Sequence, residues 1–292
     1  MTLTLITLAT LLLWSSAFPG VRAALAGGYP PAHLVLLRFL IASAVFLGLA
    51  LGGKISRPRN KDLAAISITG FLAITVYQLA LNYGEITVTA GVASMLINTA
   101  PIWTALMARS FLNEHLTARQ WTGIGIGFVG VFLIGWGLGG AEMIGQGALL
   151  VLLASFAHSA AFMFQKPLLK RYKPLEFAAY ELWAGTLFLL PFSRGLASTI
   201  RDVTPAATAS VIYLGVGPAA LAYSGWSWML ARLPASRAAS FLYFIPACSI
   251  VIAWLWLGEV PPALSVLGGL VAISGVILVN KESHPEPVKE AP

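Results

Sequence analysis

The sequence contains few charged residues and a single cysteine. Its 292 residues include 18 Lys and Arg and 11 Asp and Glu, or 10% of the chain, whereas soluble domains carry about 25% charged residues. This scarcity excludes a disordered chain and a soluble enzyme, since both need far more polar surface. One cysteine excludes an internal disulfide framework. Because Cys248 lies in an apolar run, we expect a buried structural side chain rather than a nucleophile or a metal ligand.

Long apolar segments make up most of the chain, which is 58% hydrophobic. About 20 apolar residues in a helix cross the roughly 30 Å of a bilayer core. Ten segments meet this length, at about 3–25, 32–51, 63–83, 87–109, 118–138, 145–169, 175–193, 206–231, 236–257 and 262–280. The sequence therefore predicts an all-α integral membrane protein with ten transmembrane helices. The first segment is longer than the core of a signal peptide and lacks a basic start, so we expect it to remain as a span.

The net charge of +7 indicates orientation. Fourteen Lys and Arg residues fall in the loops and tail on one side of the predicted spans, and only Arg194 and Arg201 fall on the other. Basic loops face the cytoplasm, so both termini are predicted to be cytoplasmic. The basic residues are thereby explained without a nucleic-acid partner.

The sequence contains an internal repeat. A constant offset of 145 residues aligns the fourth and fifth segments with the ninth and tenth, and the matched pairs are Pro101 and Pro246, Glu114 and Glu259, Gly123 and Gly268, and Gly130 and Gly275. The division predicts a first five-helix repeat at 1–140, a second at 141–282 and a flexible cytoplasmic tail at 283–292. Because five is odd, the second repeat is inverted, as is usual in transporters. A duplicated structural membrane protein is the non-transport alternative.

Two matching stretches carry a family resemblance. Residues 111–123 leading to Gly130, and residues 256–268 leading to Gly275, resemble the EamA branch of the drug/metabolite transporter superfamily, as does the opening 14–19. The resemblance implies a ten-helix carrier in a bacterial inner membrane, typically an exporter of amino acids or related metabolites. Within the branch, the chain looks most like exporters of aromatic amino acids.

Polar and aromatic side chains within the spans are the candidates for substrate binding, because polar groups in a membrane are costly and mark pathways or structural pairs. Aromatic walls with a few amide and hydroxyl groups suit a ligand with an apolar body and a polar end. The alternative for any one ring is a place at the lipid interface. The candidates are Trp14, Phe18, Arg38, Tyr77, Gln78, Asn82, Asn98, His158, Phe162, Gln165, Glu181, Tyr223, Trp226 and Tyr243.

Arg38 and Glu181 occupy corresponding places in the second and seventh segments. Arg38 either holds a substrate carboxylate or joins its helix to neighbours through backbone carbonyls. The second role is favoured, because buried charges in membranes usually have protein partners.

Other repeated residues suggest moving or structural parts. Pro101 and Pro246 fall well inside predicted helices, so they are expected to kink them and are candidates for gating hinges. Glu114 and Glu259 precede helices and are expected to cap helix N-termini. The glycines 123, 130, 268 and 275 provide small faces for helix contact within the chain or in a dimer.

Transport by facilitated diffusion is favoured over proton antiport, since Glu181 and His158 are the only expected intramembrane carboxylate and histidine. The chain has no His-x-x-x-His motif and no paired aspartates, so no enzyme activity, metal or cofactor is predicted. Expected partners are a small-molecule substrate and the lipid bilayer, with the protein a monomer or a weak homodimer. A carrier of sugar phosphates or nucleotide sugars, or a drug exporter, is the alternative within the superfamily. Dianionic substrates would need more intramembrane cations than Arg38.

Overall fold

The computed structural model describes residues 2–87, 96–137, 145–257 and 262–280, and within these ranges the chain forms helices and no strands. Each of the ten predicted apolar segments is helical over its described residues, apart from short turns. Six described helical stretches are long and apolar enough to cross a membrane: Leu3–Ala26, Pro31–Leu51, Asn60–Gly84, Gln146–Leu168, Pro205–Arg232 and Ala263–Asn280.

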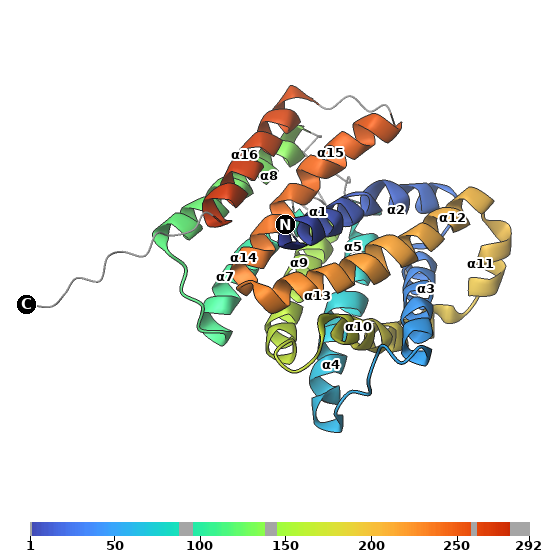
Figure 1. Ribbon diagram of the computed structural model, residues 1–292. Coiled ribbons are helices and arrows are strands. Elements are labelled where there is room, and N and C mark those ends of the chain that lie inside the picture. Colours follow the sequence, from blue (N-terminus) through green and yellow to red (C-terminus); the bar gives the residue numbers. More distant parts are fainter. Residues whose placement is uncertain (1, 88–95, 138–144, 258–261, 281–292) are drawn as a thin grey trace, which may run out of the picture.

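Figure 1 shows the described helices in chain order. The first half contains α1 (Thr2–Ser15), α2 (Ala17–Ala26), α3 (Pro31–Leu51), η1 (Asn60–Asp62), α4 (Leu63–Gly70), η2 (Phe71–Val76), α5 (Tyr77–Gly84), α7 (Ala100–Phe111) and α8 (Ala118–Gly137). The second half contains α9 (Gln146–Leu168), α10 (Pro174–Leu189), η4 (Leu190–Ser193), α11 (Leu196–Asp202), α12 (Pro205–Leu214), η5 (Gly215–Leu221), α13 (Ala222–Arg232), α14 (Ala235–Ser240), η6 (Phe241–Tyr243), α15 (Phe244–Leu257) and α16 (Ala263–Asn280).

Many large apolar side chains are exposed on the outer surface of the helices. Leu51, Phe111, Leu149 and Leu270 are each more than 60% exposed. Exposed apolar side chains spread over several helices fit contact with lipid hydrocarbon, whereas soluble monomers seldom expose large contiguous apolar patches.

Two helices are interrupted by π-helical turns at matching places. The π-helix η2 directly precedes Tyr77, and the π-helix η5 ends two residues before Tyr223. A π-turn inserts an extra residue and rotates the rest of the helix, and such turns occur often at functional sites. Both tyrosines line the cavity between the two halves of the chain.

The two prolines expected inside helices lie near helix starts instead. A turn at residues 98–99 precedes α7, and Pro101 is its second residue. Pro246 is the third residue of α15, directly after the 3-10 turn η6. A proline in the first turn removes no internal hydrogen bond, because that N–H has no partner within the helix. A turn therefore precedes the helix of Pro101, whereas Pro246 follows a 3-10 turn within the helical stretch 235–257.

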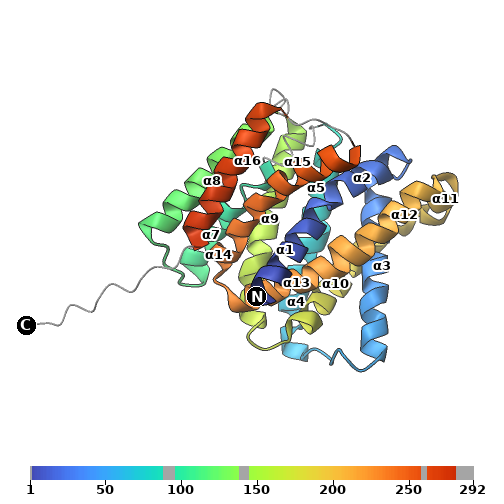
Figure 2. The same cartoon turned by 45° about the horizontal axis from the view of Figure 1, so that its top comes forward.

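α8 and α16 lie side by side in both views (Figures 1 and 2), and their glycines form the contact. A Cβ atom built on Gly130 would lie 2.6 Å from the carbonyl oxygen of Gly268, and one on Gly275 would lie 2.6 Å from that of Gly123. No side chain fits at such distances. The glycine faces are therefore used within the chain.

Polar contacts join the two halves at the loops between helices. Asp62 accepts hydrogen bonds from Arg171 Nη1 at 2.7 Å and from Tyr172 Oη at 2.8 Å. Glu114 accepts hydrogen bonds from the backbone N–H of Ala235 at 2.7 Å and from Ser236 Oγ at 2.8 Å. The Glu114 carboxylate therefore caps α14, in the other half of the chain, rather than the helix that comes after it. Its counterpart Glu259 lies outside the described residues.

Candidate functional site

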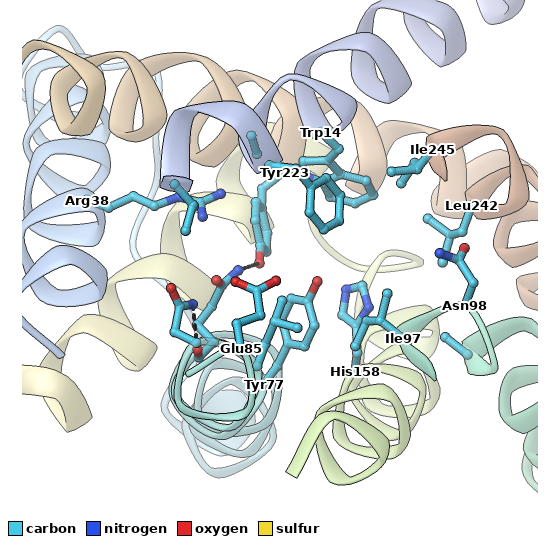
Figure 3. Close-up of a pocket in the computed structure, with 17 residues that line it drawn as sticks. Trp14, Arg38, Tyr77, Glu85, Ile97, Asn98, His158, Tyr223, Leu242 and Ile245 are labelled. Carbon is cyan, nitrogen blue, oxygen red and sulfur yellow. Dashed lines mark hydrogen bonds between the residues drawn. The ribbon is translucent and has the colours of Figure 1, made fainter. Parts of the chain in front are cut away.

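A cavity lies between helices from both halves of the chain (Figure 3). Its walls come mainly from α1, α2, α3 and α5 of the first half and from α9, α13 and the η6–α15 junction of the second. Of the predicted site residues, it brings together Trp14, Phe18, Arg38, Tyr77, Gln78, Asn82, Asn98, His158 and Tyr223.

One wall of the cavity is aromatic. The His158 ring stacks on Tyr77, with centroids 4.3 Å apart and planes 5° from parallel. Trp14 meets Tyr223 edge to face at 5.7 Å, and its Nε1 donates a hydrogen bond to the carbonyl oxygen of Pro218 in η5. These ring contacts, together with that hydrogen bond, fix the arrangement of the wall.

A second aromatic layer supports this wall from behind. Phe162 and Trp226 pack against each other with centroids 4.6 Å apart, and both are almost fully buried. Phe162 also contacts His158 at 4.6 Å, and Trp226 contacts Trp14 at 5.4 Å. Neither ring lines the cavity. Both were predicted to bind substrate, and the structure places them where they support His158 and Trp14.

Amide and hydroxyl groups also line the cavity beside the aromatic rings. Gln78 Nε2 donates to Tyr223 Oη at 3.4 Å, and Asn82 Nδ2 donates to the backbone oxygen of Gln78 at 2.8 Å, as the dashed lines in Figure 3 show. The buried Oδ1 of Asn82 accepts no hydrogen bond from the described residues. Since a buried polar atom without a partner is costly, Asn82 retains an acceptor for a ligand.

Arg38 points into the same cavity from α3 (Figure 3). The side chain is buried, its Nε finds no acceptor in the described part of the chain, and its guanidinium carbon lies 5.3 Å from the centroid of Phe39. The favoured structural role required hydrogen bonds to backbone carbonyls. None from Arg38 is present among the described residues, which leaves the guanidinium able to bind an anion in the cavity.

Glu85 also lines the cavity, although its position at the end of a predicted span did not mark it as a candidate. It comes directly after α5. Its spacing gave the signal, because Gln78, Asn82 and Glu85 succeed one another at four and three residues and so share one helix face. Burial raises the pKa of Glu85 to about 7, while the charge of Arg22 acts in the opposite direction.

Three other predicted residues lie away from the cavity. Gln165 donates a hydrogen bond to Ser227 Oγ at 2.9 Å. Tyr243 is fully buried and packs on Gly127 of α8, so it faces the neighbouring helix. Glu181 is buried in α10, and its Oε1 has no hydrogen-bond partner in the described residues. These residues do not converge with the cavity lining.

No group of three or more His, Cys, Asp or Glu side chains that could hold a metal ion occurs in the described ranges. The cavity instead combines aromatic rings, amides, a guanidinium and a carboxylate. Such a lining can bind a small organic ion with an apolar body.

Comparisons with known proteins agree with this description. The model of the EamA-like transporter family matches residues 1–136 and 145–281. The chain is 42% identical to the uncharacterised transporter YdfC of Bacillus subtilis, over 92% of this chain and 89% of that protein. It is 40% identical to a probable terminal-alkyne amino-acid exporter of Streptantibioticus cattleyicolor, over 94% of this chain and 92% of that protein.

A solved crystal structure shares the fold, with a TM-score of 0.78, 17% identity and 96% of each chain covered. A multi-pass membrane transporter accounts for the apolar helices, for the two similar halves of the sequence and for the transporter relatives. The chain therefore belongs to the EamA-like transporter family.

Proposed function

We propose that the chain crosses the bacterial inner membrane ten times, as two inverted repeats at 1–140 and 141–282 followed by a tail at 283–292, with both termini in the cytoplasm. The contacts between α8 and α16 support this arrangement. Exchanging the halves at the offset of 145 turns the contact between Gly123 and Gly275 into the contact between Gly268 and Gly130. A pseudo-two-fold axis through the helix pair produces this reciprocity.

The substrate that fits best is an amino acid with an aromatic or other apolar side chain, which the protein exports. The observation that carries this proposal is the aromatic wall of Trp14, Tyr77, His158 and Tyr223 facing Arg38 in one cavity. The rings suit an apolar body, and the buried guanidinium suits a carboxylate. The name of the Streptantibioticus relative, an exporter of an amino acid with a terminal alkyne, points the same way.

Transport proceeds by alternating access, and the structure corresponds to an outward-facing state. In the proposed orientation, Val21 and Glu85 lie toward the outer ends of their helices, and both line the cavity. The contacts of Asp62 and Glu114 lie on the cytoplasmic side and join the two halves there. Rocking of the repeats about the cavity would open one side as the other closes.

Facilitated diffusion is the proposed mode. Of the charged groups that line the cavity, Arg38 and Glu85 match the two charges of a zwitterionic substrate and leave no further carboxylate among the described lining residues for a proton. The substrate gradient then drives export without a coupling ion.

Counterflow in proteoliposomes tests the function. We expect Phe and Trp to exchange with labelled Phe at equal pH on both sides, and Thr and Lys to compete weakly. Arg38→Gln should reduce the exchange of Phe about tenfold or more, because it removes a charge-assisted contact. Preference for Thr or Lys would contradict the aromatic cavity, and an absolute requirement for a pH gradient would contradict facilitated diffusion.

A further inference from the structure

Glu85 occupies a distinct position in the cavity. It lies one residue beyond the apolar helical stretch that ends at Gly84, its backbone N–H is held by the carbonyl oxygen of Leu81, and its side chain is half-buried. Figure 3 shows its carboxylate directed into the cavity, with Arg38 and Tyr77 on the surrounding walls. The backbone is fixed by the end of α5, so the carboxylate has a defined place.

No hydrogen bond or ion pair joins the Glu85 carboxylate to any residue in the described ranges. The ionisable groups that share the cavity are Arg38 from α3, Tyr77 from α5, His158 from α9 and Tyr223 from α13. The exposed Arg22 of α2 acts on Glu85 electrostatically.

Two opposite charges thus face one cavity without neutralising each other. No ion pair or hydrogen bond joins Arg38 to Glu85, and the Nε of Arg38 has no hydrogen-bond partner in the described residues. Tyr77 lies within electrostatic reach of both charges. A charge in a partly dry site gains most from a ligand of opposite sign when no hydrogen bond or ion pair to the described residues compensates it.

We propose that Glu85 binds the ammonium group of the substrate, while Arg38 binds its carboxylate, so that the protein selects α-amino acids over the corresponding 2-hydroxy acids. This inference rests on the proposed function and adds the recognition of the amino group to it. The apolar side chain of the substrate then lies against Trp14 and His158.

The ionisation of Glu85 is consistent with this role. With a pKa of about 7, the carboxylate is ionised only in part at neutral pH. A bound ammonium group favours the ionised form, because it places an opposite charge beside the carboxylate.

Calorimetric titration of the purified protein with L-phenylalanine and with L-phenyllactate tests the proposal. The two ligands differ only in the ammonium group and the hydroxyl group that replaces it. We expect the unaltered protein to bind phenylalanine at least tenfold more tightly than phenyllactate. Glu85→Gln should weaken phenylalanine binding about tenfold or more, since it removes a charge-assisted contact, and should leave phenyllactate binding unchanged.

Two further variants complete the test. Asp202→Asn removes an exposed carboxylate outside the cavity and should change neither affinity. Glu85→Asp keeps the charge and should retain part of the preference. Unchanged phenyllactate binding shows that each variant is folded.

The assignment of Glu85 would be overturned if Glu85→Gln weakened the binding of both ligands equally, or weakened neither. The proposed function would then still stand. If the unaltered protein binds phenyllactate but not phenylalanine, the amino-acid substrate and the ammonium site both fail.

Discussion

At the scale of single residues, the charged side chains of Arg38 and Glu85 remain available to a ligand in the cavity. Arg38 is held among apolar neighbours, with the Phe39 ring 5.3 Å away, and Glu85 lies directly after the last turn of α5. Neither side chain is neutralised by the other. Removing these groups from water is costly, and a zwitterionic ligand offsets that cost at both ends.

Substrate affinity should therefore depend on pH through Glu85. The pKa of about 7 lies above the usual range for a glutamate, so the carboxyl group is protonated and neutral at pH 6 and mostly ionised at pH 8. If only the ionised form binds the ammonium group, phenylalanine should bind roughly tenfold more weakly at pH 6 than at pH 8. Calorimetry at the two pH values measures this change.

Glu85→Gln provides the control, since its affinity should not vary between the two pH values. The same pH dependence in this variant would assign the effect to another group, of which His158 is a candidate in the cavity.

Much of the site could be predicted from the sequence, but the direction in which each side chain points could not. Trp14, Arg38, Tyr77 and Tyr223 were selected as polar or aromatic residues inside apolar segments, and they do line one cavity. Tyr243 meets the same criterion but faces α8. The composition of a helix does not determine which of its faces meets a neighbouring helix. Glu85 was excluded by its place beyond an apolar run, although the run's end borders the cavity.

At the scale of helices, close packing of α8 on α16 requires glycine at defined positions. A Cβ atom on Gly130 would meet the backbone of α16 at Ala272 and Gly268. Backbone atoms cannot rotate away as a flexible side chain can, so the helices would have to separate.

We expect Gly130→Ala to destabilise the protein by about 3 kcal/mol, the upper end for overpacking in a filled interior. Gly125→Ala, in the same helix, is the matched control, because no atom lies within 4 Å of its added methyl group. That substitution should be neutral or stabilising by up to about 1 kcal/mol, since alanine favours a helix. Thermal unfolding of the purified protein in detergent compares the two. Equal midpoints would show that α8 and α16 do not pack as described.

The helical segments and their apolar character can be predicted from the sequence, and their irregularities cannot. Both π-helices arise in apolar helical stretches, at Phe71–Val76 and Gly215–Leu221, and apolar periodicity does not mark them. Pro101 and Pro246 did mark irregular places, namely a turn before α7 and the 3-10 turn η6 before α15. Tertiary packing determines whether a proline kinks a helix or begins a new one, so the sequence alone does not predict which of the two occurs.

For the whole molecule, the proposed alternating access gives the contacts at one end a role in selecting the populated state. Asp62 of the first half binds Arg171 and Tyr172 of the second, and Glu114 binds the start of α14. Hydrogen bonds to ionised groups are roughly twice as strong as those between neutral groups. We therefore expect the two contacts together to favour the state that is closed on this side over its alternative.

Removal of both contacts should open the cytoplasmic side. Ser227 reports this change, because it is fully buried in α13, five residues before that helix ends at Arg232. In a protein carrying Cys248→Ser and Ser227→Cys, a membrane-impermeant maleimide should react slowly from the cytoplasmic side of inside-out vesicles. Addition of Asp62→Ala and Glu114→Ala should accelerate the reaction at least tenfold, as expected for a loss of about 1.4 kcal/mol or more.

Asp202→Ala removes an exposed carboxylate elsewhere and should leave the reaction rate unchanged. Faster labelling only in right-side-out vesicles would reverse the proposed orientation, since the same residue would then face the outside. Equal rates with and without the two carboxylates would mean that the apolar packing of α3, α10 and α13 closes the protein by itself. The experiment thus separates the contribution of a few polar contacts from that of the helix bundle around them.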